Sequence, residues 1–138
     1  CEKPFAVNSR ESAAMIESAR RNNRLLVEAM WSRFLPPYRK IRELLESGIF
    51  GEIISVSADH GQRLPLPRYY RLHAPELAGG ALLDLGIYPI SFAYMVLGKP
   101  SSIVAQGEFT TSGVDSQTSM IFQYANGALI HALLPHNG

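Results

Sequence analysis

The last third of the chain constrains the fold most. It holds three consecutive strand candidates, 102–111, 116–124 and 127–134, and Asn126-Gly127 between the last two is typical of a two-residue hairpin turn. Strands joined by short turns pair antiparallel, because a parallel pair needs a long crossover. On the middle strand, one face carries Met120, Phe122 and Tyr124, and the other carries Ile121. The sequence therefore predicts an α+β fold with an open, mostly antiparallel or mixed sheet and helices on one face.

Two helices are predicted before the sheet. Residues 9–22 carry an apolar stripe at helical spacing, and Asn8 with Glu11 forms a start that resembles a capping box. A second helix begins at Pro36, since proline is tolerated in a first helical turn, and it ends at the C-cap residue Gly48.

A third helix is predicted over residues 81–97, which are strongly apolar. Pro89 lies inside this segment and cannot donate a hydrogen bond to the carbonyl of Leu85, so the helix either begins late or kinks there. The preceding residues 61–80 hold three prolines and are expected to be mostly irregular. Their centre, Arg68-Tyr69-Tyr70-Arg71, is cationic and aromatic, which suits a lid or an interface.

Two further segments are predicted to be strands. Residues 25–31, LLVEAMW, form an apolar run that predicts a buried strand, and residues 53–60 alternate with period two. One face of the second segment carries Ile54, Val56, Ala58 and His60. Asp59 lies on the other face, so Asp59 and His60 cannot form an acid–base dyad directly.

Composition excludes several classes of protein. A chain of 138 residues is expected to form one domain, and 46% hydrophobic with 18% charged residues excludes a disordered chain. A net charge of +1 does not indicate the basic surface that binds nucleic acid or an anionic membrane. No apolar run approaches the ~20 residues that cross a bilayer. One cysteine excludes an internal disulfide framework. No signal peptide is visible, so we expect a soluble, cytoplasmic protein with no nucleic-acid or membrane partner.

Motifs for nucleotides and metals are missing from the sequence. Neither G-x-G-x-x-G nor a Walker-type loop occurs. His73, His131 and His136 are scattered, without the spacing of a ligand pair on a helix, so no metal site is predicted.

Asp84 and Tyr88 are the main candidates for chemistry. They lie four residues apart in an apolar helix, so they share one face, and a carboxylate there costs free energy unless it is paired or hydrogen-bonded. A tyrosine acts as an acid or base only if its pKa falls from about 10, and a nearby ammonium such as Lys3 has that effect. The alternative is that Asp84 caps a helix and Tyr88 is half-buried packing. Trp31 is likewise either a pocket wall or a core residue.

Several motifs resemble the Gfo/Idh/MocA oxidoreductase family. Glu2-Lys3-Pro4 resembles the EKP motif that joins that family's Rossmann domain to its C-terminal domain. The segment 79–89, GGALLDLGIYP, resembles a second motif in which Asp precedes His or Tyr by one helical turn. EAMWSRFLP at 28–36 and GIFGEIISVSADHG at 48–61 are similar to the dimeric dihydrodiol dehydrogenase branch, which carries Tyr at the position of Tyr88.

The resemblance implies hydride transfer between a nicotinamide and a carbinol carbon of a sugar, polyol or cyclic diol. Tyr88 would be the general base or acid, Lys3 would lower its pKa and orient the nicotinamide or the substrate hydroxyl, and Asp84 would position Lys3 or a substrate hydroxyl. Contacts to the cofactor are expected from Glu2, Lys3 and Pro4, and contacts to the substrate from Trp31, Arg33, His60 and Arg71. His60 stands where related sequences often carry an aromatic residue.

The resemblance also implies a domain organisation. Residues 1–138 would be a single partial domain for substrate binding and dimerisation that begins at the EKP motif, with residues 1–7 as the interdomain junction and the Rossmann domain absent from this chain. We therefore expect a fragment of an oxidoreductase whose full-length form binds NADP or NAD. Alone, the fragment would be inactive and would not hold the cofactor tightly, and the sheet would form a homodimer or higher homo-oligomer. The alternative is a non-catalytic binding or oligomerisation module that has lost the cofactor domain.

Overall fold

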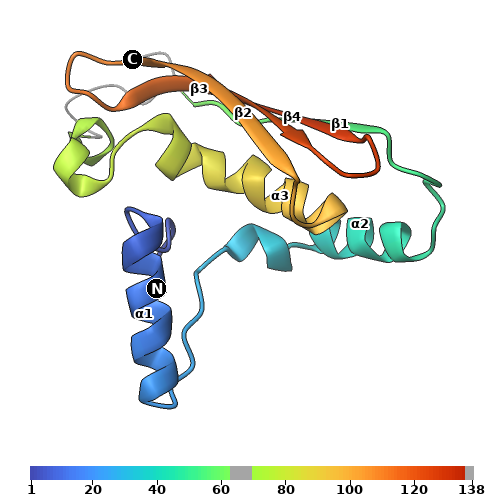
Figure 1. Ribbon diagram of the computed structural model, residues 1–138, viewed down its shortest axis with the longest axis horizontal. Coiled ribbons are helices and arrows are strands. Elements are labelled where there is room, and N and C mark those ends of the chain that lie inside the picture. The colour runs from blue at the N-terminus through green and yellow to red at the C-terminus, as the bar shows by residue number, and fades with distance from the viewer. Residues whose placement is uncertain (63–69, 136–138) are drawn as a thin grey trace.

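A four-stranded sheet with helices on one side forms the body of the molecule (Figure 1), and the computed structural model describes residues 1–62 and 70–135. The strands are β1 (Ser55–Asp59), β2 (Ser102–Phe109), β3 (Asp115–Gln123) and β4 (Leu129–Pro135), in the order β1-β4-β3-β2. β1 runs parallel to β4, and the other two pairs are antiparallel. The predicted α+β class with an open, mostly antiparallel sheet is confirmed.

The turn between β3 and β4 forms where the sequence predicts it. Gly127 has φ +87°, a conformation that glycine adopts without a steric cost, and the Asn126 side chain accepts a hydrogen bond from the N–H of Ala128. Gln123 pairs with Leu129 at the base of the hairpin. The hairpin fixes the register that keeps the alternate residues of both strands on one face.

Two of the predicted helices form nearly as expected. α1 (Ser9–Arg21) begins where the Asn8 side chain accepts the N–H of Glu11 at 2.9 Å. α2 (Pro36–Glu46) has proline in its first turn and is followed by Gly48 at φ +72°. α1 buries none of its residues and stands apart from the sheet and its helical layer (Figure 1).

The third predicted helix consists of two elements. A π-helical turn, Leu82–Gly86, leads into α3 (Ile87–Leu97), which lies along the sheet (Figure 1). Pro89 is therefore in the first turn of α3, where its missing N–H is tolerated. Of the two expected alternatives, a late start or a kink at Pro89, the structure shows the late start of the regular helix.

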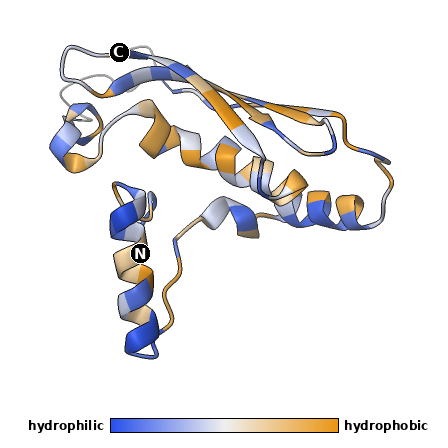
Figure 2. Ribbon diagram, in the orientation of Figure 1, coloured by the Kyte–Doolittle hydropathy of each residue, from blue (hydrophilic) through white to orange (hydrophobic). Residues whose placement is uncertain are grey.

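The buried strand predicted at residues 25–31 does not form. The segment is extended and apolar (Figure 2), but Leu25 and Val27 are 92% and 54% exposed, and Trp31 begins a 3₁₀ turn, Trp31–Phe34. Two hydrogen bonds join this segment to Cys1, which donates to the carbonyl of Val27 and accepts from the N–H of Ala29, both at 2.7 Å. A strand forms only against a neighbouring strand, and the described part of the chain places none beside this segment.

Residues 61–80 are less irregular than predicted. Two short 3₁₀ turns, Tyr70–His73 and Pro75–Leu77, carry the chain from the end of the undescribed segment to Gly79. Arg68 and Tyr69, from the predicted cationic and aromatic centre, lie outside the described residues.

The core lies between α3 with its π-helical turn and the sheet. Its buried residues are Ala81, Leu85, Ala93, Met120, Phe122, Tyr124, Ala128, Ile130, Ala132 and Leu134. The predicted alternation on β3 is confirmed, because Met120 and Phe122 are buried while Ile121 is on the open face.

One segment corrects an expectation drawn from the sequence. Pro75–Leu97 is long and apolar enough, by length and composition alone, to cross a membrane. In the fold, Leu85 and Ala93 of this segment belong to the core, and the Asp84 carboxylate forms an ion pair with Lys3. Packing against the sheet accounts for part of its apolar composition, since 33% of the apolar window is buried.

Tyr124 provides a test of this core. Its hydroxyl is buried and has no hydrogen-bond partner among the described residues, and burial, with a smaller effect of Tyr94, raises its pKa above the ordinary value of 10.0. An unpaired buried hydroxyl costs about 1–3 kcal/mol, so Tyr124→Phe is expected to leave the free energy of unfolding unchanged or raise it. A raised pKa means that the stability present below pH 10 is lost as the pH rises through the folded-state pKa. In urea unfolding, the variant should lose less stability than wild type above about pH 10; equal losses would show that Tyr124 is not buried as described.

Candidate functional site

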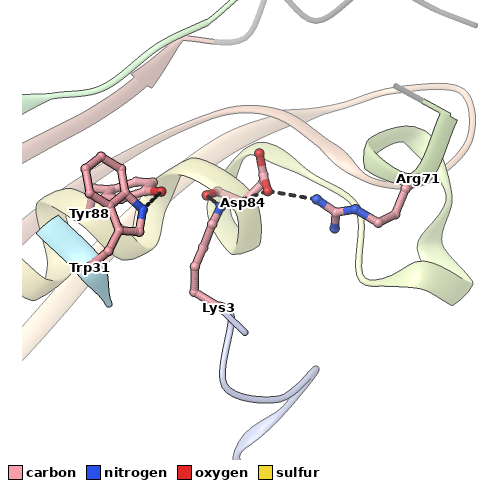
Figure 3. A network of polar contacts seen from close by, with 5 residues as sticks. All are labelled: Lys3, Trp31, Arg71, Asp84 and Tyr88. Carbon is pink, nitrogen blue, oxygen red and sulfur yellow. Dashed lines mark hydrogen bonds and ion pairs between the residues drawn. The ribbon is translucent and has the colours of Figure 1, made fainter. Parts of the chain in front are cut away.

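Two cations, Lys3 and Arg71, contact the carboxylate of Asp84 (Figure 3). The Lys3 ammonium lies 3.0 Å from Asp84 Oδ1 and donates to the Asp84 carbonyl at 2.6 Å. The Arg71 guanidinium contacts the same carboxylate oxygen at 3.0 Å. Asp84 is only 8% exposed, and a carboxylate this buried is stable when it is paired and hydrogen-bonded. The carboxylate is therefore a fixed anchor for the Lys3 ammonium.

Two glycines allow the chain to approach this anchor closely. A side chain at Gly79 would lie 2.6 Å from the carbonyl oxygen of Leu72, and one at Gly80 would lie 2.2 Å from Asp115 Oδ1. The N–H of Gly80 donates to the carbonyl of Leu72 at 2.9 Å. The Gly-Gly pair thus holds the turn that carries Arg71 against the start of the π-helical turn that carries Asp84.

Asp115 fixes the other side of the same turn. Its Oδ2 accepts hydrogen bonds from the backbone N–H of Leu82 and from the hydroxyl of Thr118, both at 2.8 Å. The N–H of Leu82 belongs to the first turn of the helical segment, where backbone donors lack internal partners. Asp115 therefore connects β3 to the segment that presents Asp84 and Tyr88.

Replacing Gly80 with alanine is expected to lower the free energy of unfolding of this chain by about 3 kcal/mol or more. Gly80 has φ +113°, which costs an L-residue about 1–2 kcal/mol, and the added methyl group would collide with Asp115, at about 1–3 kcal/mol. Gly51→Ala is the control, because Gly51 has φ +62° and open space around it, so about 1–2 kcal/mol is expected. Urea unfolding of both variants tests the difference; equal losses would show that Asp115 and Gly80 are not in close contact.

Tyr88 lies on the first turn of α3, one helical turn beyond Asp84. The Trp31 indole N–H donates to the Tyr88 hydroxyl at 3.2 Å, and the Lys3 ammonium lies 5.2 Å from the centre of the Tyr88 ring. The His60 ring is 4.9 Å away, centre to centre. Because Trp31 occupies an acceptor site of the Tyr88 oxygen, the phenolic O–H remains available to donate to a ligand.

These side chains border a cleft of about 340 Å³. Its walls are formed by Lys3, Trp31, Ser32, Leu35, Tyr38, His60, Gln62, Asp84, Leu85 and Tyr88. The cleft combines a cation, a phenol, an imidazole and an amide with aromatic and aliphatic surface. That mixture suits a small ring that carries several hydroxyl groups.

The structure brings most of the predicted site residues together. Lys3, Trp31, His60, Asp84 and Tyr88 all line the cleft, and Arg71 contacts Asp84. The alternative for Asp84 is not supported, because its carboxylate pairs with two cations and caps no helix. Trp31 is 57% exposed and therefore is not a core residue.

Arg33 and Glu2 are not brought to the cleft. Both are exposed, and Arg33 uses its backbone carbonyl to accept a hydrogen bond from Arg42. Pro4 is half-buried and is also absent from the cleft wall. The sequence reasoning missed Tyr38 and Gln62 as wall residues and the hydrogen bond between Trp31 and Tyr88. Within residues 1–62 and 70–135, no group of three or more His, Cys, Asp or Glu side chains could hold a metal ion.

Comparison with known proteins gives one family. The model of the GFO/IDH/MocA C-terminal domain matches residues 38–134. Trans-1,2-dihydrobenzene-1,2-diol dehydrogenase from Xenopus laevis is 42% identical over 127 residues, which cover 91% of this chain and 38% of that protein. The chain therefore spans less than two fifths of the length of this curated relative.

Solved structures show the same fold. An aldose-aldose oxidoreductase from Caulobacter crescentus, complexed with glycerol, superposes with a TM-score of 0.88 at 27% identity, covering 96% of this chain and 42% of that one. A 3-ketoreductase from Actinomadura kijaniata, in complex with NADP and TDP-benzene, gives a TM-score of 0.88 at 26% identity, covering 99% and 42%.

Proposed function

Because this chain belongs to the GFO/IDH/MocA family, we propose that it is the substrate-binding part of an NAD(P)-dependent oxidoreductase that acts on a carbinol of a sugar, polyol or cyclic diol. The observation that carries the proposal is the cleft itself. A phenol lies beside an ammonium that a buried carboxylate holds in place, and all three line one cavity. Proton transfer at a substrate oxygen needs such a group within hydrogen-bond reach.

Tyr88 is the group that exchanges a proton with the substrate. Its hydroxyl accepts from Trp31, so the oxygen is held in one place and its hydrogen is directed to other acceptors. In carbonyl reduction the phenol donates this proton to the substrate oxygen, and in alcohol oxidation the same oxygen takes the proton back.

Lys3 and Asp84 position the substrate. The ammonium is fixed by the carboxylate and the backbone carbonyl of Asp84, which leaves one of its three donors for a substrate hydroxyl. Arg71 holds the carboxylate from the far side. The ammonium therefore stabilises negative charge that develops on the substrate oxygen.

Only the nicotinamide end of the cofactor fits the residues of this chain. The cleft offers a flat aromatic wall at Trp31 and a cation at Lys3, whereas the sequence holds no glycine-rich loop for a pyrophosphate. Lys3 and Trp31 would hold a nicotinamide, which supplies the donor or acceptor of the hydride. We propose that the pyrophosphate and adenosine are bound by a separate nucleotide-binding domain.

We propose that the open face of the sheet contacts a second copy of the chain. This face has a shallow hollow of about 410 Å³ that includes the apolar side chains Val104, Ile121 and Leu133. Val104 and Leu133 are exposed. Light scattering of the native-length protein, meaning the polypeptide that its source organism makes, should give a dimer or a larger oligomer; a monomer would contradict this assignment.

The mass and the activity of the native-length protein test the proposed function. We expect an intact mass more than about twice 15.2 kDa, since the matched region covers only 38% of the curated relative, and we expect turnover of sugars or diols with NAD or NADP. A mass of 15.2 kDa together with no turnover would contradict the proposal and favour a non-catalytic binding module.

A further inference from the structure

A smaller cavity of about 100 Å³ opens beside the cleft. Tyr38, His60 and Tyr88 line both cavities, so the two spaces meet at these three side chains. The remaining wall of the smaller space, called here the side cavity, is formed by Ala58, Asp59, Pro89 and Phe92. A ligand at the Tyr88 hydroxyl therefore has space for a substituent next to these shared residues.

The side cavity has a mixed polar and apolar lining, and its wall is well supported. Tyr38 and Phe92 pack edge to face at 5.9 Å and 83°, and Pro89 is buried. Ala58 is half-buried on the helix-facing side of β1, on the face that also carries His60. Its polar residues are Tyr38, His60 and Tyr88, which it shares with the cleft, and Asp59. A small group that carries one hydroxyl suits this mixed wall.

Size limits what can enter. A cavity of about 150 Å³ holds benzene, so one of 100 Å³ holds a group of about two to four heavy atoms. We propose that the side cavity is a subsite for a short substituent on the substrate ring, such as the hydroxymethyl group that a hexose carries and a pentose lacks. This inference rests on the proposed function, because it assumes that the reacting carbinol lies at Tyr88.

The test compares D-glucose with D-xylose, which differ by this hydroxymethyl group, in the native-length protein. Ala58→Leu fills the side cavity and is expected to lower the ratio of kcat/KM for glucose over xylose by at least about tenfold. The basis is that one extra carbon group in a fitting pocket changes kcat/KM by about 10–200-fold. Ser57→Leu is the matched control, because Ser57 is exposed on the opposite face of β1, and the ratio should stay at its wild-type value. An equal effect of both variants on the two sugars would overturn the inference.

A second variant keeps the test decisive if Ala58→Leu fails to fold. Phe92→Leu enlarges the same space, and it is expected to raise the ratio for glucose 6-O-methyl ether over glucose by at least about threefold, as the extra methyl group finds room. No change in that ratio would overturn the subsite. If wild type turns over both sugars and the ratios are unchanged in the variants, the subsite alone is rejected. If wild type turns over no sugar or diol, the proposed function is rejected.

Discussion

Tyr88→Phe is expected to lower kcat of the native-length protein by roughly 10²–10⁴-fold, the usual contribution of a positioned acid or base. Phenylalanine keeps the ring that packs against His60 and Trp31 and removes only the oxygen that accepts from the Trp31 indole. The thermal midpoint should therefore change little. The measurement is steady-state kinetics with NADP and NAD, in both reaction directions.

Tyr94→Phe is the matched control for this prediction. Tyr94 lies on the same helix, is 44% exposed and does not line the cleft, so its hydroxyl should not affect kcat. Equal kcat values for wild type and Tyr88→Phe would remove Tyr88 from the chemistry and leave it as a packing residue.

Lys3→Met is expected to lower kcat by about 10²-fold or more, because the site loses the cation that stabilises charge on the substrate oxygen. It should also lower the free energy of unfolding by about 1–2 kcal/mol. Asp84 would keep its contact with Arg71 but lose that with Lys3, and a buried carboxylate that loses a partner is destabilised. Kinetics and urea unfolding measure the two effects separately.

Lys99→Met is the control, since Lys99 is exposed and outside the cleft. If Lys3→Met lowered stability but left kcat unchanged, Lys3 would be a structural partner of Asp84 and not a group that acts on the substrate. Lys3→Arg separates charge from geometry, because arginine keeps the charge and cannot reproduce the compact ammonium between the carboxylate and the carbonyl of Asp84.

Local sequence patterns predict the sheet well because each pattern favours one local structure. Asn126-Gly127 favours a tight turn, and the alternation around Met120 and Phe122 fixes which face is buried. Pro89 likewise predicts a late start of the regular helix, which the π-helical turn Leu82–Gly86 provides.

Residues 25–31 show where such reasoning fails. An apolar run predicts a strand, but a strand also needs a neighbour to satisfy its backbone groups. Local sequence gives no information on whether that neighbour is present.

The candidate site was predictable in part. The spacing of Asp84 and Tyr88 follows from helical geometry, and the resemblance of the EKP motif points to Lys3. The Arg71–Asp84 pair and the hydrogen bond from Trp31 to Tyr88 depend on loops whose course the sequence does not define. Arg33 shows the opposite error, since its position beside Trp31 in the sequence does not bring its side chain to the cleft.

The most direct test of the account is a single-turnover experiment on the native-length protein. Reduced nicotinamide cofactor is mixed with excess enzyme and a sugar or diol-derived carbonyl substrate, and the loss of nicotinamide absorbance is followed in wild type and Tyr88→Phe. The account predicts that wild type oxidises the bound cofactor completely and that the variant does so at least about 100-fold more slowly, with cofactor affinity unchanged. Oxidation at the same rate in both proteins would contradict the assignment of this cleft as the site of proton transfer.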